Sequence, residues 1–281
     1  MEADQKPDFN SKSAKSLLEY YKGQFALDLA NQLAYRGSLV IWVLSGIMQP
    51  LVSIVIWQAV ADSQGGTAGG FTSGEFAAYF IITMLVSHFT FIWHMWEFEW
   101  RIRTGFFTPI LLRPIHPIHN DISQNLSFKI VGLIGIVPGV ILMGIVFNAD
   151  FSSTNWRDVI AFLPALLLAM VLRFVLEWTL ALAAFWLTKV SSINNVFGML
   201  FLFLGGQFAP LSVMPDFVQT IATILPFRWC IAFPTEVALG NVSGQDALFG
   251  FGMQLLWISI AATVLVLTWK RAMKQYTAVG A

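Results

Sequence analysis

Long apolar stretches alternate with short polar segments along the 281 residues. Because the hydrocarbon core of a bilayer is about 30 Å thick, a helix needs about 20 mostly apolar residues to cross it. Five stretches meet this requirement, and a sixth is shorter and interrupted. The predicted spans are Gly37–Val60, Phe76–Trp96, Ile130–Phe147, Val159–Leu187, Asn195–Ala209 and Leu248–Trp269. The pattern therefore predicts an all-α membrane protein with six transmembrane helices.

The region 205–235, after the fifth predicted span, cannot continue as one straight helix. It contains Gly206, Pro210, Pro215 and Pro226 among its apolar residues. Irregular backbone at membrane depth is tolerated only where protein or water covers it. Two interpretations follow: a re-entrant hairpin that closes the outer end of a path, or an external loop with two short interfacial helices.

The positions of lysine and arginine predict the orientation, because short cytoplasmic loops collect positive residues. With the amino terminus inside, only Arg157 and Arg228 fall outside and Arg173 lies within a span. The other thirteen fall inside: Lys6, Lys12, Lys15, Lys22, Arg36, Arg101, Arg103, Arg113, Lys129, Lys189, Lys270, Arg271 and Lys274. We therefore expect residues 1–36 and 270–281 to be cytoplasmic, on either side of a six-span membrane domain over residues 37–269.

Two segments are predicted not to cross the membrane. Ser13–Arg36 carries leucines and aromatic residues at helical spacing, which is typical of an amphipathic helix on the inner membrane surface. This helix would form an elbow into the first span. The inner connection over residues 97–128 is about 30 residues long, charged, and rich in proline and histidine. A connection of this kind is a candidate surface for a cytoplasmic partner.

The composition supports a protein whose main solvent is lipid. Hydrophobic residues make up 57% of the chain and charged residues 11%, whereas soluble domains carry about 25% charged residues. Lysine plus arginine equals aspartate plus glutamate at 16 each, so no positive field indicates nucleic-acid binding. Cys230 is the single cysteine, which excludes an internal disulfide.

Two charged residues, Arg173 and Glu177, lie four positions apart within the fourth predicted span, so they share a helix face. A charge at this depth costs about 2.5–3.5 kcal/mol on insertion scales, which favours a functional role. A structural ion pair that fixes helix packing is the alternative, because pairing removes much of that cost. A third interpretation places the pair on a polar cavity, where a cationic substrate would meet Glu177.

Metal and catalytic sites are not predicted. His116 and His119 are separated by Pro117, and the sequence offers no further ligands near them that would complete a zinc site. Acid–base chemistry needs titratable groups that converge in one pocket, and the acidic residues here lie mostly in loops. We expect the two histidines to contact lipid headgroups or a partner at the inner surface.

Two motifs resemble the ABC-2 type permease family. The run Leu111-Leu112-Arg113-Pro114-Ile115-His116-Pro117 is similar to the segment that follows the second span in that family. The run Gly206-Gln-Phe-Ala-Pro210-Leu-Ser-Val-Met-Pro215-Asp-Phe, followed by Leu225-Pro226-Phe227-Arg228, resembles its re-entrant hairpin between spans five and six. Within the family, the chain looks most like the small permeases encoded as unequal pairs, such as viologen-type exporters.

The resemblance implies one half of an ABC exporter that moves a hydrophobic or amphipathic, small-molecule or lipid-like compound outward across the cell inner membrane. A second permease subunit and cytoplasmic ATPase subunits would complete it. No Gly-x-x-x-x-Gly-Lys-Ser/Thr phosphate loop occurs in the chain. No cofactor is therefore expected here, and ATP and magnesium are expected on the partner ATPase.

The family's mechanism places a coupling helix in the inner connection, within residues 100–118. By this resemblance Arg101, Arg103, Arg113, Pro114 and His116 are predicted to contact the ATPase. Two other classes stay open from the residues: an ion-coupled secondary transporter built on Arg173 and Glu177, and an integral-membrane enzyme that modifies lipids.

Overall fold

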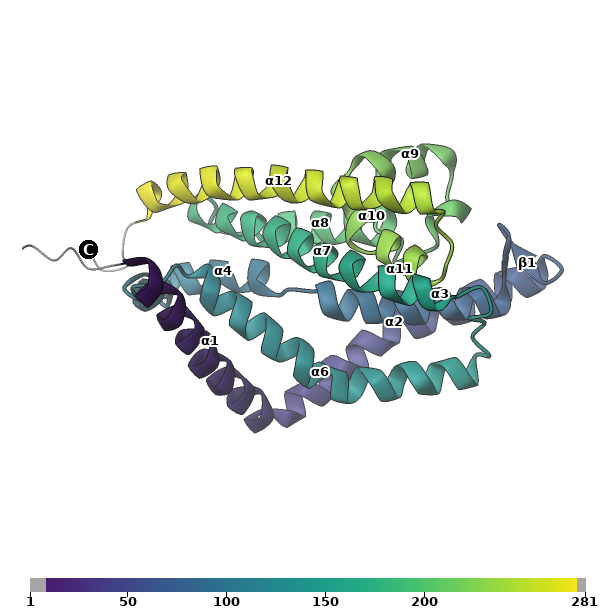
Figure 1. Ribbon diagram of the computed structural model, residues 1–281, viewed down its shortest axis with the longest axis horizontal. Helices are drawn as coiled ribbons and strands as arrows, with labels where there is room; N and C mark the ends of the chain where they lie inside the picture. The colour runs from purple at the N-terminus through teal and green to yellow at the C-terminus, as the bar shows by residue number, and fades with distance from the viewer. Residues whose placement is uncertain (1–8, 277–281) are drawn as a thin grey trace, which may run out of the picture.

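The computed structural model describes residues 9–276, which form an elongated bundle of helices (Figure 1). The long helices are α1 (Phe9–Ala34), α2 (Arg36–Ser63), α3 (Ser73–Thr90), α6 (Ile118–Val146), α7 (Trp156–Ala181) and α12 (Gly244–Gln275). The shorter helices are α4 (His94–Arg103), α5 (Phe107–Leu111), η1 (Leu182–Phe185), α8 (Ser191–Leu204), η2 (Leu211–Val213), α9 (Asp216–Ile224), α10 (Pro226–Cys230) and α11 (Ala232–Ala238). A small hairpin of β1 (Thr67–Ala68) and β2 (Phe71–Thr72) joins α2 to α3.

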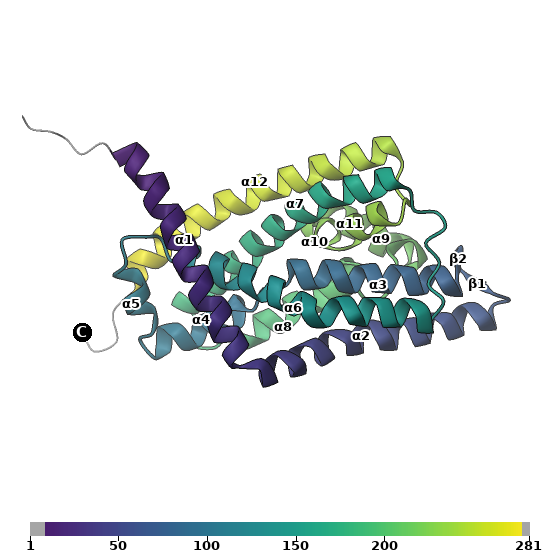
Figure 2. The ribbon, with the colours of Figure 1, turned by 60° about the horizontal axis from the view of Figure 1, so that its bottom comes forward.

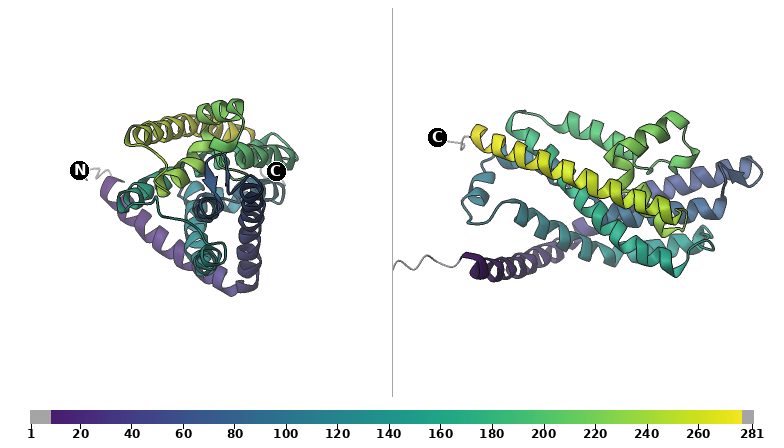
Figure 3. Two further views of the ribbon diagram at one scale, coloured as in Figure 1. Left: turned by 90° about the vertical axis from the view of Figure 1, so that its right-hand side faces the viewer. Right: turned by 45° about the horizontal axis from the view of Figure 1, so that its top comes forward.

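Five helical segments of the described chain are long and apolar enough to cross a membrane. They are Val40–Ser63, Ser73–Arg103, Ile118–Val146, Trp156–Phe185 and Gly244–Gln275. The end-on view in Figure 3 places α3 in the middle of the bundle, in agreement with the many buried residues along its length. The prediction of an all-α membrane protein is therefore confirmed in its class, and the count of six stays a prediction.

The predicted fifth span corresponds to α8, which has 14 residues. At 1.5 Å per residue such a helix is about 21 Å long, shorter than the hydrocarbon thickness. The chain then continues through η2, α9, α10 and α11 at the end of the bundle that carries the β1–β2 hairpin (Figure 1). Region 205–235 is thus folded as a series of short helices.

Two boundaries differ from those predicted. The second predicted span is interrupted after Thr90, and α4 begins only at His94. Helix α6 begins at Ile118 rather than Ile130, so the connection that includes α5 covers only residues 104–117. The reason is that the polar residues of 119–129 face the protein interior: Asn120, Asp121, Ser123, Asn125, Ser127 and Lys129 are all buried. Polarity along the chain indicated a loop there, whereas the tertiary structure provides polar partners.

Helix α1 is helical over the predicted elbow, and it crosses α6 at an angle (Figure 2). Polar side chains make the contact. The Ser123 hydroxyl donates to Asp28 over 2.9 Å, and the Gln32 amide donates to the Ser127 hydroxyl over 2.6 Å. Meanwhile Leu18 and Leu33, which belong to the predicted apolar face, are exposed. The first residues of α1 and the last of α12 lie at the same end of the bundle.

Candidate functional site

The end of the bundle formed by α4, α5 and the 104–117 connection carries all five residues predicted to contact an ATPase. Arg101 is buried, with Nη1 2.7 Å from Asp121 Oδ1 and Nη2 2.9 Å from Glu97 Oε2. Arg103 points away from this cluster, with its side chain 67% exposed and Nη1 2.9 Å from Glu99 Oε1. The two arginines therefore differ in role: Arg101 holds helices together, and Arg103 is available at the surface.

The other three residues lie in the turn before α6. Arg113 and Pro114 are exposed, and the Arg113 guanidinium donates to the side-chain oxygen of Asn120 over 3.3 Å. The His116 ring packs against Trp269, with ring centroids 4.4 Å apart. Loss of water around this ring, together with nearby His119, lowers the pKa of His116 below its ordinary value. His116 therefore joins the connection to the carboxyl-terminal helix.

Exposed apolar side chains accompany the arginines at this end. Trp100, Phe106 and Leu112 are 49%, 58% and 81% exposed, and the rings of Trp100 and Phe106 stack with centroids 4.7 Å apart. We call these three residues, with Arg103 and Arg113, the inner-end surface. Apolar patches with a polar rim are typical of protein interaction sites.

The buried Asp121 side chain contacts residues of two other helices near this surface. Its Oδ1 accepts from Arg101, and its Oδ2 accepts from the indole N–H of Trp178 over 2.9 Å. His94 lies 3.5 Å from the same carboxylate, and both residues are buried. The Asp121 carboxylate thus joins α4, α6 and α7. Nothing in the sequence indicated this junction, because Asp121 stands in a segment whose polarity predicted a loop.

Arg173 and Glu177 form the predicted ion pair, with Nε 2.6 Å from Oε1 and both side chains buried. The guanidinium also donates through Nη1 to the Thr90 hydroxyl over 3.1 Å, at the end of α3. Its carbon lies 4.4 Å from the centre of the Phe201 ring, within cation–π range. One arginine therefore contacts three helices, α3, α7 and α8.

Lys129 was counted among the inner positive residues, but its side chain is buried beside the break between α3 and α4. Its Nζ donates to the Phe91 carbonyl over 3.0 Å and also contacts Asn125 Oδ1. The Asn125 amide donates to the same carbonyl over 3.1 Å. These donors satisfy a carbonyl that the interrupted helix leaves free, as buried backbone groups require.

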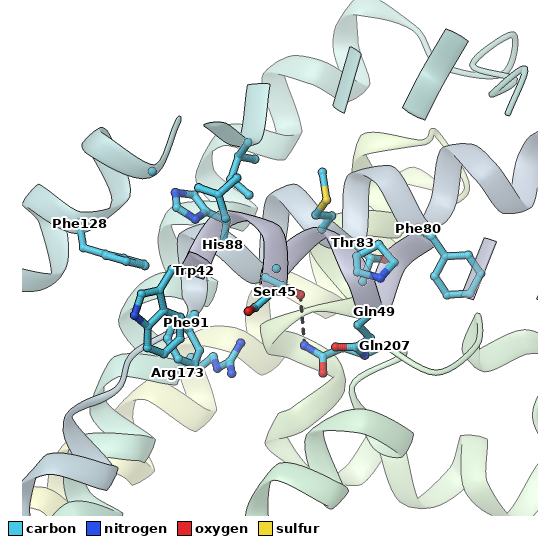
Figure 4. A pocket seen from close by; sticks show the side chains of 17 residues that line it. Trp42, Ser45, Gln49, Phe80, Thr83, His88, Phe91, Phe128, Arg173 and Gln207 are labelled. Carbon is cyan, nitrogen blue, oxygen red and sulfur yellow. Dashed lines mark hydrogen bonds between the residues drawn. The ribbon is translucent and has the colours of Figure 1, made fainter. Parts of the chain in front are cut away.

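A cavity of about 330 Å³ lies beside the ion pair (Figure 4). Helices α2, α3 and α6 form most of its wall, and Arg173 and Gln207 reach it from α7 and from the segment after α8. The Gln207 amide donates to the Ser87 hydroxyl over 3.1 Å. The lining residues are Trp42, Val43, Ser45, Gly46, Gln49, Pro50, Phe80, Thr83, Met84, Ser87, His88, Phe91, Phe128, Gly132, Ile136, Arg173 and Gln207.

Glu177 is not among these lining residues and is 1% exposed. Arg173 is therefore the member of the pair that faces the cavity. The interpretation in which a cationic substrate meets Glu177 has no geometric support here.

A second pocket of about 280 Å³ adjoins the first, where α1 meets α2. Its wall includes Tyr35, Trp93 and the three aromatic residues Trp42, Phe91 and Phe128, which also line the larger cavity. The Trp42 ring lies 6.1 Å from Phe91 and 6.4 Å from Phe128, centre to centre. The two spaces thus share these aromatic side chains as part of their walls. No motif in the sequence indicated either of them.

The four residues predicted to lie in the hairpin stand at turns and helix starts within region 205–235. Gly206 has φ +79°, and a Cβ there would lie 2.5 Å from the Tyr79 hydroxyl, which donates to the Gly206 carbonyl. Pro210 and Pro215 directly precede η2 and α9, and Pro226 is the first residue of α10. Proline suits these positions because a first helical turn needs no backbone N–H.

Helices α10 and α11 are embedded in the bundle. Every residue from 226 to 239 is buried except Arg228 and Glu236, and these two pair over 2.9 Å. Helices α10 and α11 together pack against α7, α3 and α12. The re-entrant hairpin stays a prediction, and the part of it that follows Pro226 is buried by its neighbours.

Comparison with known proteins identifies the class. The family described as ABC-2 family transporter protein matches residues 47–280, so the chain belongs to the ABC-2 transporter family. This membership confirms the family predicted from the sequence, and with it a multi-pass membrane transport subunit rather than an enzyme.

A characterised relative is the linearmycin resistance permease protein LnrN of Bacillus subtilis strain 168. It is 22% identical over 217 residues, which cover 75% of this chain and 53% of the relative. The chain thus spans about half the length of that protein.

Proposed function

We propose that this chain is the permease subunit of an ABC exporter that moves a hydrophobic or amphipathic compound out of the cell. Separate cytoplasmic ATPase subunits would power it. Membership of the ABC-2 transporter family supports this proposal, and so does a relative named as a resistance permease. The observation that carries it is the inner-end surface, which combines exposed arginines and apolar side chains at one end of the predicted spans.

The proposed topology has six crossings with both termini in the cytoplasm. The five long segments supply five of them, and α8 with the buried α9–α11 region supplies the remaining one as a short span and re-entrant hairpin. Helix α1 is the elbow at the inner face of the cell inner membrane. The β1–β2 hairpin and α9 lie at the outer end.

In the proposed mechanism, α5 and the 104–117 connection bind a groove of the ATPase and follow its motion. Arg101 and Asp121 then transmit that motion, because their buried ion pair ties α4 to α6, and Trp178 ties α7 to the same carboxylate. A buried charge pair resists separation, since either partner alone would be an uncompensated charge. The connection and three helices would therefore move as a unit.

The proposed assembly contains a second permease, identical or related, and two ATPase subunits that bind ATP and magnesium. Purification of the chain from its native membrane in a mild detergent, with mass spectrometry of the proteins that accompany it, tests this assembly. We expect a cytoplasmic ATPase to co-purify. A chain that purified alone and stayed active without ATP would contradict the proposal and favour an ion-coupled carrier based on Arg173 and Glu177.

The coupling role of the inner-end surface has its own test. Arg113→Glu reverses a charge on an exposed side chain, so we expect intact membrane insertion, continued ATP hydrolysis and loss of coupled transport. Arg157→Glu is the matched control, because Arg157 is also exposed and belongs to the first turn of α7, the helix that begins at the opposite end of the bundle (Figure 1). Transport per ATP hydrolysed, measured in proteoliposomes, decides the matter: an unchanged ratio in Arg113→Glu would remove Arg113 from the contact.

A further inference from the structure

We propose that the cavity beside the ion pair binds the anionic headgroup of an amphipathic molecule at Arg173, and that its apolar tail lies along the aromatic walls. The molecule reaches the cavity through the pocket between α1, α2 and α6. This proposal rests on the proposed transport function, for which it specifies the class of substrate.

The first argument is the unused donor capacity of Arg173. Nε is bonded to Glu177 and Nη1 to Thr90, and Nη2 has no hydrogen bond among the described residues. Within the described part of the chain, Arg173 is the lone Lys, Arg, Asp or Glu on the cavity wall. A guanidinium with free N–H groups recognises carboxylate and phosphate oxygens, since these bonds are charge-assisted. The ion pair with Glu177 fixes the guanidinium but does not use all of its donors.

The second argument is the balance of charge around this point. Glu177 is buried behind Arg173 and does not reach the cavity. Charges act strongly on one another where water is excluded. The charged group that a ligand meets in the cavity is therefore the Arg173 guanidinium, which favours an anion over a cation.

The third argument is the polar side chain of Gln49, which lines the cavity from the middle of α2. Gln49 has no hydrogen bond among the described residues, and Gln207, which also lines the cavity, is bonded to Ser87. Figure 4 labels both side chains, together with Arg173, among those that line the cavity. Gln49 is exposed, so its amide is free to bond a polar group of a ligand in the cavity, where lipid would offer it no partner.

The fourth argument concerns the route. Trp42, Phe91 and Phe128 form the boundary shared by the two pockets, and Figure 4 shows them together at the Arg173 side of the cavity. The second pocket is mostly apolar, and Tyr35 at its rim is 72% exposed. With α1 at the inner face, this rim adjoins the inner leaflet. Each space is close to the lower limit of ligand pockets, about 300 Å³, so together they suit one narrow chain.

Photo-crosslinking of the purified full chain in phosphatidylcholine nanodiscs tests the proposal. The probes are myristate with a diazirine in its tail and a tail-matched alkyl trimethylammonium with the same diazirine. Labelled peptides are mapped by mass spectrometry. We expect myristate to label residues of α2 and α6 with saturation, and to be displaced by unlabelled myristate. The trimethylammonium probe should label the α2 and α6 peptides only at concentrations at which it also labels α12. Labelling of α12 serves as the measure of non-specific labelling from the bilayer.

A double variant tests whether the anionic headgroup binds at Arg173. Arg173→Gln/Glu177→Gln removes both charges of the ion pair together, so neither member is left without the other. We expect the half-saturating myristate concentration to rise about tenfold, the loss of one charge-assisted hydrogen bond. Arg157→Gln, a loss of one exposed arginine from the same helix, is the matched control and should leave labelling unchanged. The comparison of the two probes on the unmodified chain needs no variant, so it stands if the double variant fails to fold.

Equal saturable labelling by both probes, or unchanged labelling in the folded double variant, would overturn the proposal. Replacement of phosphatidylcholine by phosphatidylglycerol identifies the source of the anion. Competition by phosphatidylglycerol would assign the site to a bilayer lipid, and its absence would assign the site to a single-chain compound. The experiment contains no ATPase. If the crosslinking results contradicted anion binding, the proposal of ATP-driven transport would be unaffected. If no ATPase co-purified, the crosslinking results would be unaffected.

Discussion

The buried arginines Arg173 and Arg101 are each held by several partners, as expected where an isolated ion would be very costly. Arg173 bonds Glu177 and Thr90 and lies over the Phe201 ring, and Arg101 bonds both Asp121 and Glu97. A buried pair is a weak sign of stability, but removal of one partner leaves an uncompensated charge. The two clusters therefore make distinct predictions for single and double variants.

Glu177→Ala should harm the protein more than Arg173→Ala/Glu177→Ala. The single change leaves a buried guanidinium without its carboxylate, at a cost of about 3–5 kcal/mol, whereas the double change removes both charges. The yield of monodisperse protein and its thermal unfolding midpoint in detergent measure the difference. Equal losses in the two variants would show that the pair does not contribute as a unit.

Arg101→Gln and Arg103→Gln separate a structural arginine from a surface one. Loss of Arg101 leaves the buried Asp121 without its ion pair and should lower stability by about 3 kcal/mol. Loss of Arg103 breaks an exposed pair worth about 0.5 kcal/mol or less. The unfolding midpoints of the two variants, compared with that of the unmodified protein, provide the measurement. Similar midpoints would mean that Arg101 does not hold α4 against α6.

At the scale of elements, close helix approach depends on glycines that no periodicity identifies. Gly250 on α12 faces the Phe233 ring of α11, and a Cβ on it would overlap that ring. Gly252 stands two positions further along the same helix, and a Cβ there would meet no atom of the described residues within 4 Å. The helix thus packs tightly on one face and is open on another.

Gly250→Ala should therefore destabilise the protein by about 1–3 kcal/mol, because the buried ring must move to admit the methyl group. Gly252→Ala should be neutral or stabilising by up to about 1 kcal/mol, since alanine is the better helix former. Thermal unfolding of the two purified variants tests this. A Gly250→Ala protein as stable as Gly252→Ala would show that α11 and α12 are further apart than described.

At the scale of the whole molecule, the two ends of the bundle differ in character. One end gathers the start of α1, the α5 connection and the end of α12, and the other gathers the β1–β2 hairpin and α9 (Figure 1). The proposed topology places these ends on opposite sides of the inner membrane. Cys230 is buried, so a reactive cysteine can be introduced with little background.

Cysteines at Gln64, Leu112 and Arg271 test this topology in a Cys230→Ala background. All three positions are exposed in the structure, Leu112 the most at 81%. On intact cells, a membrane-impermeant maleimide should label Gln64→Cys and neither of the others. Leu112→Cys and Arg271→Cys should react after the membrane is permeabilised. Labelling of Arg271→Cys on intact cells would refute an even number of crossings.

Much of the outline could be predicted from the sequence. The apolar stretches indicated the class of fold and most long helices, and the segments 111–117 and 206–228 indicated the family. Prediction failed where polarity was taken as exposure. Residues 119–129 extend α6, and Lys129 and Arg101 are buried rather than on the inner surface. A polar residue looks the same in the sequence whether water or a buried partner satisfies it.

What the sequence by itself determined is therefore what depends on local composition: lengths of apolar helices, the breaks at Gly206, Pro210, Pro215 and Pro226, and the spacing that pairs Arg173 with Glu177. Only the tertiary structure decided which member of that pair faces a cavity, and which arginine is buried. Those outcomes depend on side chains from distant helices, such as Thr90 and Phe201 around Arg173. Hydrogen bonds and desolvation act between neighbours in space, and the order of residues does not specify those neighbours.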